Sequence, residues 1–337
     1  MSAKIKVGVA GAGRVAKLAH LPAYNSDPRS NIRAIAEVDP ARREDAATEY
    51  SITETYSDAE EMIQQEDLDI ISICTPPFTH RDIFISAAKA GCDIYCEKPL
   101  CTSLSEANQM ADAARENDTI VQVGYIYQYH PNFHRARDII QNNILRDIEQ
   151  ANIVFGTSGP KEQGWRFDRD KNPQGILGEI TTHLLDFYLS CFDGTPEVVS
   201  ANLSSEKYSI IDEAELELHI GDTEINLVTN WTQVGNRVHN HIIRGKNGWI
   251  EITDQFLKGN INGEDINVKY GVSPTVDIRS ADGKLFDLFL GKGEMDIQTK
   301  RIVDFIDHVA ERNRETVAPI ERGVNITKIV EDAYEKR

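Results

Sequence analysis

The chain has 337 residues, 40% of them hydrophobic, and this length favours two domains over one or three. Its net charge of −18, from 54 acidic and 36 basic residues, argues against nucleic acid or an anionic membrane as a partner. No apolar run reaches the roughly 20 residues of a membrane helix, and no secretory-signal pattern stands at the N-terminus. Five cysteines, an odd number in a long chain, fit free thiols in a reducing compartment, so we expect a cytoplasmic protein.

Strands and helices alternate over roughly the first 126 residues. The apolar run "IKVGVA" at 5–10 predicts a buried strand, and a glycine turn leads from it into a helix at about 15–24. Further strands are predicted at 31–39, 68–77, 92–99 and 120–126, with helices at 41–50, 81–91 and 103–119. Such alternation is typical of a parallel sheet covered by helices on both faces.

After about residue 150 the pattern changes to longer strands, several of which alternate apolar and polar residues. They are predicted at 150–156, 197–205, 213–221, 223–233, 240–253 and 266–271, separated by Gly, Asn and Asp turns. This pattern predicts an antiparallel sheet with one open face. A helix at about 176–192 interrupts the strands, and helices at about 295–312 and 322–335 follow them.

The loop "GAGRVA" at 11–16 connects the first strand to the first helix. Gly11 permits the tight turn, Gly13 lets the backbone approach a pyrophosphate, and Ala16 supplies a third small residue for helix–strand packing. Arg14 and Val15 lie at the helix N-terminus, where free N–H groups and the helix dipole favour a phosphate. The strand–turn–helix context favours a dinucleotide site over a plain glycine turn, with Arg14 and Val15 among the cofactor contacts.

An acidic residue follows the second strand at the distance that a dinucleotide fold requires. Glu37 lies about 21 residues beyond the glycine loop, where a carboxylate accepts hydrogen bonds from the adenosine ribose. Because a carboxylate there repels a 2′-phosphate, NAD is the preferred cofactor. NADP stays possible through Arg42 and Arg43, although a solvated helix face explains these two better. Asp39 is either a second ribose contact or, as we prefer, the N-cap of the next helix.

The segments "VGVAGAGRVA", "ICTPPFTHRD", "AAKAGCDIYCEKPL", "VQVGYIYQYHP" and "GILGEITTHLLDFY" occur in this order along nearly the whole chain. Together they resemble the Gfo/Idh/MocA oxidoreductases, the family of glucose-fructose oxidoreductase and inositol dehydrogenase. The resemblance implies a Rossmann dinucleotide-binding domain at 1–125. It also implies an α+β domain at 126–337 for substrate binding and oligomerisation, with a large, mostly antiparallel, open-faced sheet. The last helices would either stay with that domain or pack back on the first.

The resemblance implies hydride transfer between NAD(P) and a hydroxyl-bearing carbon of a sugar, an inositol or a nucleotide-sugar. It also accounts for "IYCEKPLC" at 94–101, where a strand ends on a base that is costly to bury and a proline. Lys98 would project at the nicotinamide and the substrate hydroxyl, because ligands bind at the carboxyl ends of parallel strands. Glu97 would hold Lys98 or the nicotinamide environment in place. An ordinary ion pair at a strand end is the alternative.

The segment "GEITTHLLDFY" at 178–188 looks like the catalytic helix of the family. Glu179 and His183 are four residues apart and so share a helical face, and Asp186 follows three residues later as an expected substrate contact. By resemblance, His183 is the acid/base that takes the proton from the reacting hydroxyl. Glu179 stands where the family usually has Asp, and it is expected to orient Lys98 or His183. A purely structural histidine is the alternative.

Three further positions near the nicotinamide come from the resemblance. Thr75 and Pro76 end a strand and are expected to line the nicotinamide edge. His80 either contacts a ligand or is an ordinary residue at the start of a helix.

Four positions are expected to contact the substrate. Tyr127 and Gln128 lie in "YIYQYHP", with Gln128 where many relatives carry Arg. Trp165 and Arg166 match a "WR" pair common in the family, so the ring would stack on a sugar and the guanidinium would bind a carboxylate or phosphate. A tryptophan in the core of a β domain is the alternative.

Cys92, Cys96 and Cys101 lie within ten residues, but neither interval is the C-x₂-C of common zinc or iron–sulfur sites. We interpret them as packing thiols and expect no metal.

The sequence therefore favours a dehydrogenase with a small carbohydrate-type substrate, self-associated through the second sheet as a dimer or tetramer. A non-catalytic NAD-binding regulator and an NAD-dependent glycosidase of the same family are the alternatives. The joint presence of Glu97, Lys98 and His183 favours the dehydrogenase.

Overall fold

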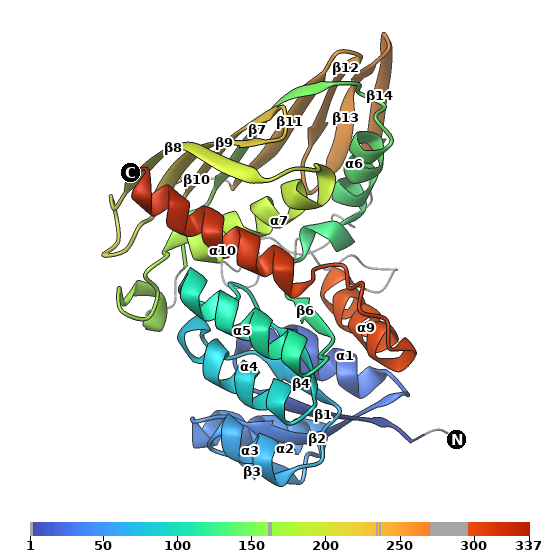
Figure 1. Cartoon of the computed structure of the whole chain (residues 1–337), viewed down its shortest axis with the longest axis vertical. Coiled ribbons are helices and arrows are strands. Elements are labelled where there is room, and N and C mark those ends of the chain that lie inside the picture. Colours follow the sequence, from blue (N-terminus) through green and yellow to red (C-terminus); the bar gives the residue numbers. More distant parts are fainter. Residues whose placement is uncertain (1–2, 161–163, 234, 236, 270–295) are drawn as a thin grey trace. The chain divides into compact units, whose positions relative to one another are not determined.

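The computed structural model describes residues 3–160, 164–233, 235, 237–269 and 296–337 (Figure 1). The chain divides into two compact units. Residues 1–125 and 298–324 form the first, and residues 126–297 and 325–337 form the second. The first unit therefore includes a segment from near the C-terminus in addition to the 1–125 expected from the sequence, and helix α10 (Ile320–Glu335) contributes to both units.

Six parallel strands form the sheet of the first unit, in the order β3-β2-β1-β4-β5-β6. The strands are β1 (Ile5–Ala10), β2 (Ser30–Ala36), β3 (Glu54–Tyr56), β4 (Ile70–Ile73), β5 (Asp93–Cys96) and β6 (Val121–Val123). The order reverses direction at β1, and doubly wound sheets bind their ligands outside the carboxyl ends of the strands at such a point.

Helices cover both faces of this sheet. The helical elements are η1 (Ala16–His20, π-helical), α1 (Leu21–Ser26), α2 (Pro40–Tyr50), α3 (Ala59–Gln65), α4 (His80–Lys89), α5 (Leu104–Glu116) and α9 (Ile297–Glu311). Residues of α1, α2 and α9 share one apolar core with Val7 and Val9 of β1. Gly8, between those two valines, faces the opposite side, where a Cβ would lie within 3.3 Å of Met62 on α3. This alternation of buried faces confirms the predicted Rossmann-type parallel sheet.

Eight strands form the sheet of the second unit, in the order β14-β13-β12-β11-β7-β10-β9-β8. They are β7 (Ile148–Gly156), β8 (Pro196–Ser204), β9 (Glu213–Ile220), β10 (Thr223–Asn230), β11 (Val238–Gly245), β12 (Gly248–Ile252), β13 (Phe256–Ile261) and β14 (Glu264–Lys269). Only the pairing of β7 with β10 is parallel among these described strands, so the sheet is mostly antiparallel, as predicted.

One face of this sheet packs against helical elements, namely α6 (Pro131–Gln141), η5 (Leu177–Thr181, π-helical) and α7 (Thr182–Cys191) (Figure 1). Strand β10 alternates buried and half-buried residues along its whole length, which is typical of a sheet covered on one side. On the other face no described helix is drawn over the strands (Figure 1). Val154 on β7 and Trp249 on β12 alternate with the buried residues of their strands, so they lie on this other face, where both are exposed.

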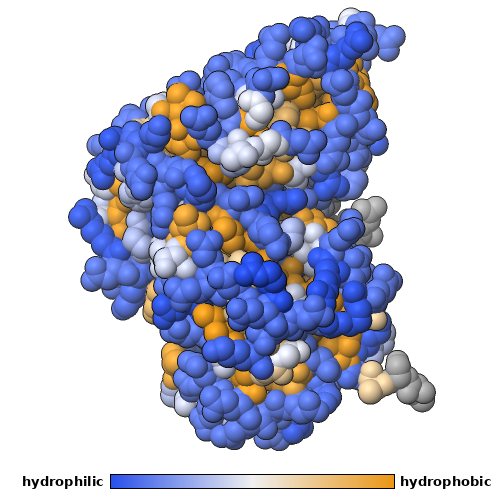
Figure 2. Space-filling model, in the orientation of Figure 1, coloured by the Kyte–Doolittle hydropathy of each residue, from blue (hydrophilic) through white to orange (hydrophobic). Residues whose placement is uncertain are grey.

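Hydrophilic residues cover most of the face drawn in Figure 2, which agrees with the high content of charged residues. In the part of the chain that the structure describes, no helix is long and apolar enough to cross a membrane. All five cysteines are buried free thiols.

Candidate functional site

The glycine loop leaves β1 at the centre of the first sheet. Gly11 has a φ of 96°, and a Cβ there would lie 3.0 Å from the backbone carbonyl of Cys74. At Gly13 no described atom lies within 4 Å of the position of a Cβ, so the backbone is open to an approaching group. A turn that only glycine fits, followed by an uncovered backbone at a helix start, suits the pyrophosphate of a dinucleotide.

Glu37 ties the glycine loop to the end of β2. Its Oε2 accepts the Ala12 N–H at 2.7 Å, and its Oε1 accepts the Asp39 N–H at 3.0 Å. A carboxylate has about four lone-pair positions, so these two bonds leave acceptors for ribose hydroxyls. The residues at this loop therefore fit an NAD-type dinucleotide.

Asp39 is the N-cap of α2. Its Oδ1 accepts the backbone N–H groups of Ala41 and Arg42, and these bonds lower the pKa of its carboxyl group. This is the alternative that the sequence favoured. Arg43 donates to the backbone carbonyl of Glu37, and Arg42 lies 3.8 Å from Asp39. Both arginines lie on α2 and thus have partners in the segment just before that helix.

His80 lies beneath the ends of two neighbouring strands. Its Nε2 lies 2.8 Å from the Thr75 carbonyl oxygen, and its Nδ1 lies 3.1 Å from the Leu100 carbonyl and 3.5 Å from the Cys96 thiol. Burial lowers the pKa of His80, so the ring is neutral and only one nitrogen donates. The shorter contact indicates that Nε2–H donates to Thr75. His80 is fully buried and so favours the structural alternative, whereas Thr75 and Pro76 are half-buried at the strand end.

Glu97 points into the core of the first unit, and Lys98 follows it at the end of β5. Glu97 Oε1 lies 2.9 Å from His20 Nε2 and 2.7 Å from Arg301 Nη1, and Oε2 accepts the Lys98 N–H at 3.3 Å. Burial alone would raise the pKa of Glu97, but Arg301 and His20 outweigh it and hold that pKa well below its usual range. Glu97 is therefore a buried carboxylate, and Lys98 is half-buried.

In the second unit, His183 lies near the start of α7, which follows the π-helical turn η5. Its side chain is buried, with an exposed fraction of 9%, and its ring meets Tyr127 edge-on with centroids 5.9 Å apart. Wide π-helical turns are often found at functional sites, and η5 contains Glu179.

Three predicted site residues meet beside η5. The guanidinium of Arg166 lies over the ring of Trp165 at 4.7 Å, and its Nε is 3.5 Å from Glu179 Oε2. Arg166 is about one-third exposed and Glu179 is 12% exposed, so this pair stands at a partly accessible surface. The cation of Arg166 is thus held between an aromatic face and a carboxylate.

Gln128 and Asp186, predicted to contact substrate, contact each other. Gln128 Nε2 donates to both carboxylate oxygens of Asp186, at 3.0 and 2.9 Å, and Gln128 Oε1 accepts from Arg137 at 3.0 Å. Asp186 is fully buried and Gln128 is 5% exposed. These two residues therefore support the start of α6 against α7.

A chain of buried histidines lies below Tyr127 and was not foreseen. His241 Nδ1 lies 2.9 Å from Tyr188 Oη, the Nε2 atoms of His241 and His239 are 2.9 Å apart, and His239 Nδ1 lies 2.8 Å from Asp254 Oδ1. Arg237 pairs with the other carboxylate oxygen of Asp254 at 3.0 Å. The ring of His239 is 5.2 Å from that of Tyr127. The pattern H-x-H on a strand, which puts both rings on one face, was the available signal.

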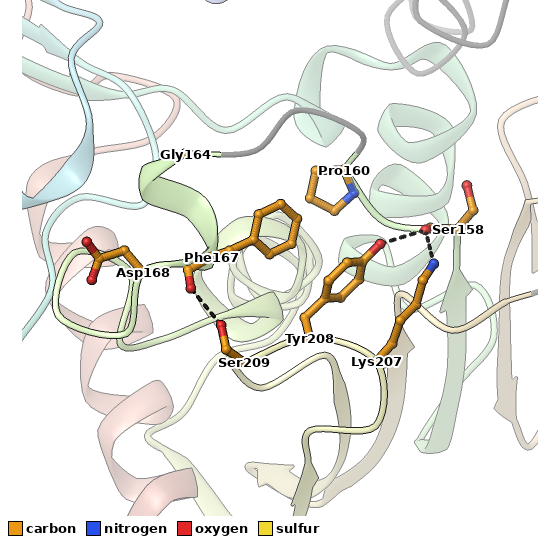
Figure 3. Close-up of a pocket in the computed structure, with 8 residues that line it drawn as sticks. All are labelled: Ser158, Pro160, Gly164, Phe167, Asp168, Lys207, Tyr208 and Ser209. Atoms are coloured by element: carbon orange, nitrogen blue, oxygen red, sulfur yellow. Dashed lines mark hydrogen bonds between the residues drawn. The ribbon is translucent and has the colours of Figure 1, made fainter.

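A cavity of about 830 Å³ opens between two loops of the second unit (Figure 3). The rings of Phe167 and Tyr208 are 4.6 Å apart and, with Pro160, face the same space. Lys207 Nζ and Tyr208 Oη both donate to the Ser158 carbonyl, at 2.9 and 3.2 Å. Cavities of this size with aromatic walls and a few polar groups are typical of small-molecule sites.

The loop that carries Lys207 and Tyr208 is held firmly. Asp212 accepts the backbone N–H groups of Glu206, Lys207 and Tyr208, and Ser209 donates to the Phe167 carbonyl at 2.7 Å. The cavity wall is thus preorganised, and Phe167 follows directly after Arg166 in the chain.

Two family sequence models match the chain. One, described as an oxidoreductase family with an NAD-binding Rossmann fold, matches residues 5–125. The other, described as a GFO/IDH/MocA C-terminal domain, matches residues 133–251.

Curated relatives match over different lengths. The uncharacterized oxidoreductase YrbE of Bacillus subtilis (strain 168) is 32% identical over 170 residues, which are 47% of this chain and 50% of YrbE. A levoglucosan dehydrogenase of Pseudarthrobacter phenanthrenivorans is 29% identical over 54% of this chain and 50% of that relative. The chain thus spans about half of these two. It is 25% identical to the scyllo-inositol 2-dehydrogenase (NADP(+)) IolW of Bacillus subtilis over 98% of this chain and 93% of IolW.

Solved structures share the fold. A levoglucosan dehydrogenase in complex with NADH and levoglucosan has a TM-score of 0.81 at 22% identity, covering 99% of this chain and 97% of the other. An oxidoreductase domain protein from Kribbella flavida has a TM-score of 0.84 at 19% identity, covering 100% and 98%. Motifs, sheets and both family matches agree, and the chain belongs to the Gfo/Idh/MocA family of oxidoreductases, with an NAD-binding Rossmann domain and the C-terminal domain of that family.

Proposed function

We propose that this protein is an NAD(P)-dependent dehydrogenase that acts on a hydroxyl-bearing carbon of a sugar, an inositol or a nucleotide-sugar. Lys98 and His183 serve in proton transfer, and Glu179 orients Lys98 or His183. The observation that carries the proposal is the position of Lys98, just beyond the carboxyl end of β5, an inner strand of an NAD-binding sheet.

The chain supplies proton handling and alignment, while bound NAD supplies the hydride acceptor. His183 takes the proton from the substrate hydroxyl, and the ammonium of Lys98 donates a hydrogen bond to the oxygen that becomes a carbonyl. Glu179, already beside the cation of Arg166, adds a negative charge that favours a protonated partner. Thr75 and Pro76 form the wall at the nicotinamide edge.

The substrate class is supported by two independent features. Relatives include enzymes named for levoglucosan, scyllo-inositol and myo-inositol, all of them polyhydroxylated rings. The cavity of the second unit offers the rings of Phe167 and Tyr208 to the apolar face of such a ring, and Lys207 to its hydroxyls or to an anionic substituent. We place the part of the substrate remote from the reacting carbon in this cavity.

A panel of sugars, inositols and nucleotide-sugars, each assayed with NAD and with NADP for absorbance at the reduced nicotinamide, tests the proposal. Sustained reduction with at least one compound is the expected result. Cofactor binding without turnover of any compound, joined to capture of a specific protein partner, would establish the regulator instead. Cleavage of a glycoside without net reduction of NAD would establish the glycosidase.

Replacing Glu37 with Gln is expected to lower the affinity for NAD by roughly 10- to 100-fold, because charge-assisted bonds to the ribose contribute about 1.5–3 kcal/mol. The affinity for NADP should change less, since the repelling charge is lost as well. Calorimetric titration of both cofactors measures this, with the exposed Glu44→Gln on α2 as control. An unchanged ratio of the two affinities would contradict the role of Glu37.

Replacing Tyr208 with Ala is expected to raise KM for the sugar about 5- to 10-fold with little change in kcat, because stacking on the substrate ring contributes about 1 kcal/mol in both ground and transition states. Steady-state kinetics at saturating NAD measures both constants. Tyr50→Ala, a half-buried tyrosine of the first unit, should leave them unchanged. A fall in kcat alone would remove the cavity from substrate binding.

We further propose self-association through the open face of the second sheet and a cytoplasmic location. Val154 and Trp249 are exposed on that face among polar side chains, which suits contact with a second copy. Light scattering of the wild type and of Trp249→Glu tests the assembly, and a monomer at micromolar concentration in the wild type would refute it.

A further inference from the structure

Arg301 is a buried arginine in the core of the first unit. It lies on α9, with an exposed fraction of 1%, far along the chain from the strands that it contacts. Besides the contact to Glu97, its Nη1 donates to Tyr95 Oη at 2.9 Å and to the Gly124 carbonyl at 3.1 Å. Gln122 Nε2 donates to the Arg301 carbonyl at 2.8 Å. Both the side chain and the backbone of Arg301 are therefore fixed to the ends of β5 and β6.

Glu97 also accepts a hydrogen bond from His20, which is itself oriented by Ser72 and Tyr24. Tyr24 Oη donates to Ser72 Oγ at 3.3 Å, and Ser72 Oγ lies 2.7 Å from His20 Nδ1. Burial lowers the pKa of His20, so its ring is neutral and carries one proton. The consistent assignment puts that proton on Nε2, toward Glu97, and leaves Nδ1 to accept from Ser72. Glu97 thus acts only as a hydrogen-bond acceptor, and its described partners all belong to the first unit.

The backbone at Gly124 packs closely against this ion pair. A Cβ at residue 124 would lie 2.8 Å from Glu97 Oε2 and 2.9 Å from Arg301 Nη1, so a larger residue there would displace one of these two side chains. The carboxylate in turn accepts the Lys98 N–H, which fixes the backbone from which the Lys98 side chain leaves. A buried carboxylate that loses its cation either takes up a proton or moves toward water, and either change releases the Lys98 backbone.

The same strand has a second ion pair at its other end, which provides a matched control. Arg312, just beyond α9, bonds to Asp93 at the start of β5, and Asp93 also accepts the Ile120 N–H at 2.9 Å. The amino ends of parallel strands lie away from the ligand crevice. One strand is therefore tied to one helical segment at both ends, and only one end carries Lys98.

We infer that Arg301 is a positioning residue for Lys98, acting through the buried carboxylate of Glu97. The inference rests on the proposed role of Lys98 in the reaction. Arg301 is buried, so its contribution is the placement and the electrostatic surroundings of the lysine amine. His20 assists it as the neutral donor on the same carboxylate oxygen.

Arg301→Met is expected to reduce kcat roughly 100-fold, the loss typical of a small displacement of a catalytic group, with little change in KM for NAD. Arg312→Met removes the ion pair at the other end of β5 and should leave kcat within about twofold. Ile306→Ala, a buried residue of the same helix, reproduces a loss of stability without touching Glu97. Arg301→Lys keeps the positive charge but loses the planar guanidinium with its several donors, so it should recover part of the turnover.

The double variant Glu97→Gln with Arg301→Met separates placement from stability. It removes both buried charges, so the resistance to urea should return toward that of the wild type. The rate at which a thiol reagent labels the buried cysteines of the first unit in urea measures this resistance. Turnover should stay low, because the amide no longer holds Lys98 as the carboxylate does. Recovery of both stability and turnover would show a purely structural role and overturn the inference.

A readout independent of activity keeps this test separate from the proposed function. Reductive methylation at a series of pH values, read by peptide mass spectrometry, reports the protonation state of the Lys98 amine. The exposed Lys89 serves as the internal reference. Release of the Lys98 backbone in Arg301→Met should shift the labelling midpoint of Lys98, with no shift in Arg312→Met or Ile306→Ala. An unmoved midpoint refutes the inference, whereas absence of turnover in the wild type with a moved midpoint refutes only the dehydrogenase.

Discussion

Replacing His183 with Asn, or Lys98 with Met, is expected to lower kcat by a factor of about 10² to 10⁴, the range usual for a general acid or base. Both substitutions keep the approximate side-chain volume. His183 packs edge-on against Tyr127 and Lys98 is held through its backbone N–H, so the fold should survive the changes. Affinity for NAD should stay within a few-fold in both variants. Steady-state kinetics and calorimetry measure the two effects.

Combining the His183 and Lys98 substitutions in one protein tests whether the two residues serve the same reaction. Residues that act as a unit are strongly non-additive, so the double variant should lose about as much as the more damaging single variant. His134→Asn, an exposed histidine on α6, is the matched control and should leave kcat unchanged. Near-normal turnover in both single variants would remove the assigned roles, although family membership would stand.

The second unit is expected to lose stability steeply as pH falls below about 6.5, because its buried histidines resist protonation. Burial lowers the pKa of His130 to about 4, and it also lowers the pKa values of His239 and His241. The unfolded chain therefore binds protons that the folded chain does not, so stability is complete above the unfolded value and is lost below it. For His130 alone, a shift from about 6.5 to about 4 corresponds to roughly 3 kcal/mol.

Asp254 adds a second loss at lower pH. Burial would raise the pKa of its carboxyl group, but His239 and Arg237 outweigh burial and hold that pKa well below its usual range. The contribution of the Asp254 carboxylate to stability is therefore present above about pH 4, the ordinary pKa of Asp, and disappears as the pH falls further. Replacing Asp254 with Asn leaves Arg237 without its carboxylate and should cost about 3–5 kcal/mol near neutral pH.

Urea unfolding at several pH values, followed by tryptophan fluorescence, measures both effects. The three tryptophans, Trp165, Trp231 and Trp249, all belong to the second unit, so the signal reports that unit alone. His130→Asn keeps an acceptor for the N-cap of α6 but cannot titrate, so its stability should vary less between pH 6.5 and 4 than that of the wild type. His134→Asn should follow the wild type, and equal slopes in all three proteins would contradict the argument.

Periodicity predicted most of the elements and missed β3, α3, α6 and β13. The strand at 5–10 and the helix at 103–119 were found because apolar residues recur at the right interval. The three-residue strand β3 is too short to show a period, and the adjoining α3 has only seven residues. The helix α6 was missed because its aromatic and basic residues follow directly on the motif at 121–131. The predicted strand at 266–271 ends at Lys269, and the rest of that prediction lies outside the described residues.

The site could be predicted where its residues are contiguous, and not where partners come from distant segments. The glycine loop and the Asp39 cap each depend on a few neighbouring residues, and Glu37 lies at a fixed spacing from that loop. The partner of Glu97 is an arginine on a helix near the C-terminus, and nothing in its local sequence distinguishes it from a surface charge. The same holds for Gln128 and Asp186, which bond each other although both were expected to contact substrate.

The ion pair between Glu97 and Arg301 has a consequence for how the chain matures. During synthesis the first unit emerges with a carboxylate whose cation has yet to be translated, together with the rest of α9. Contacts of such long sequence separation form late, since the intervening loop must close first. The first unit can therefore complete its core only after α9 has left the ribosome, and a product shortened before α9 would lack part of both units.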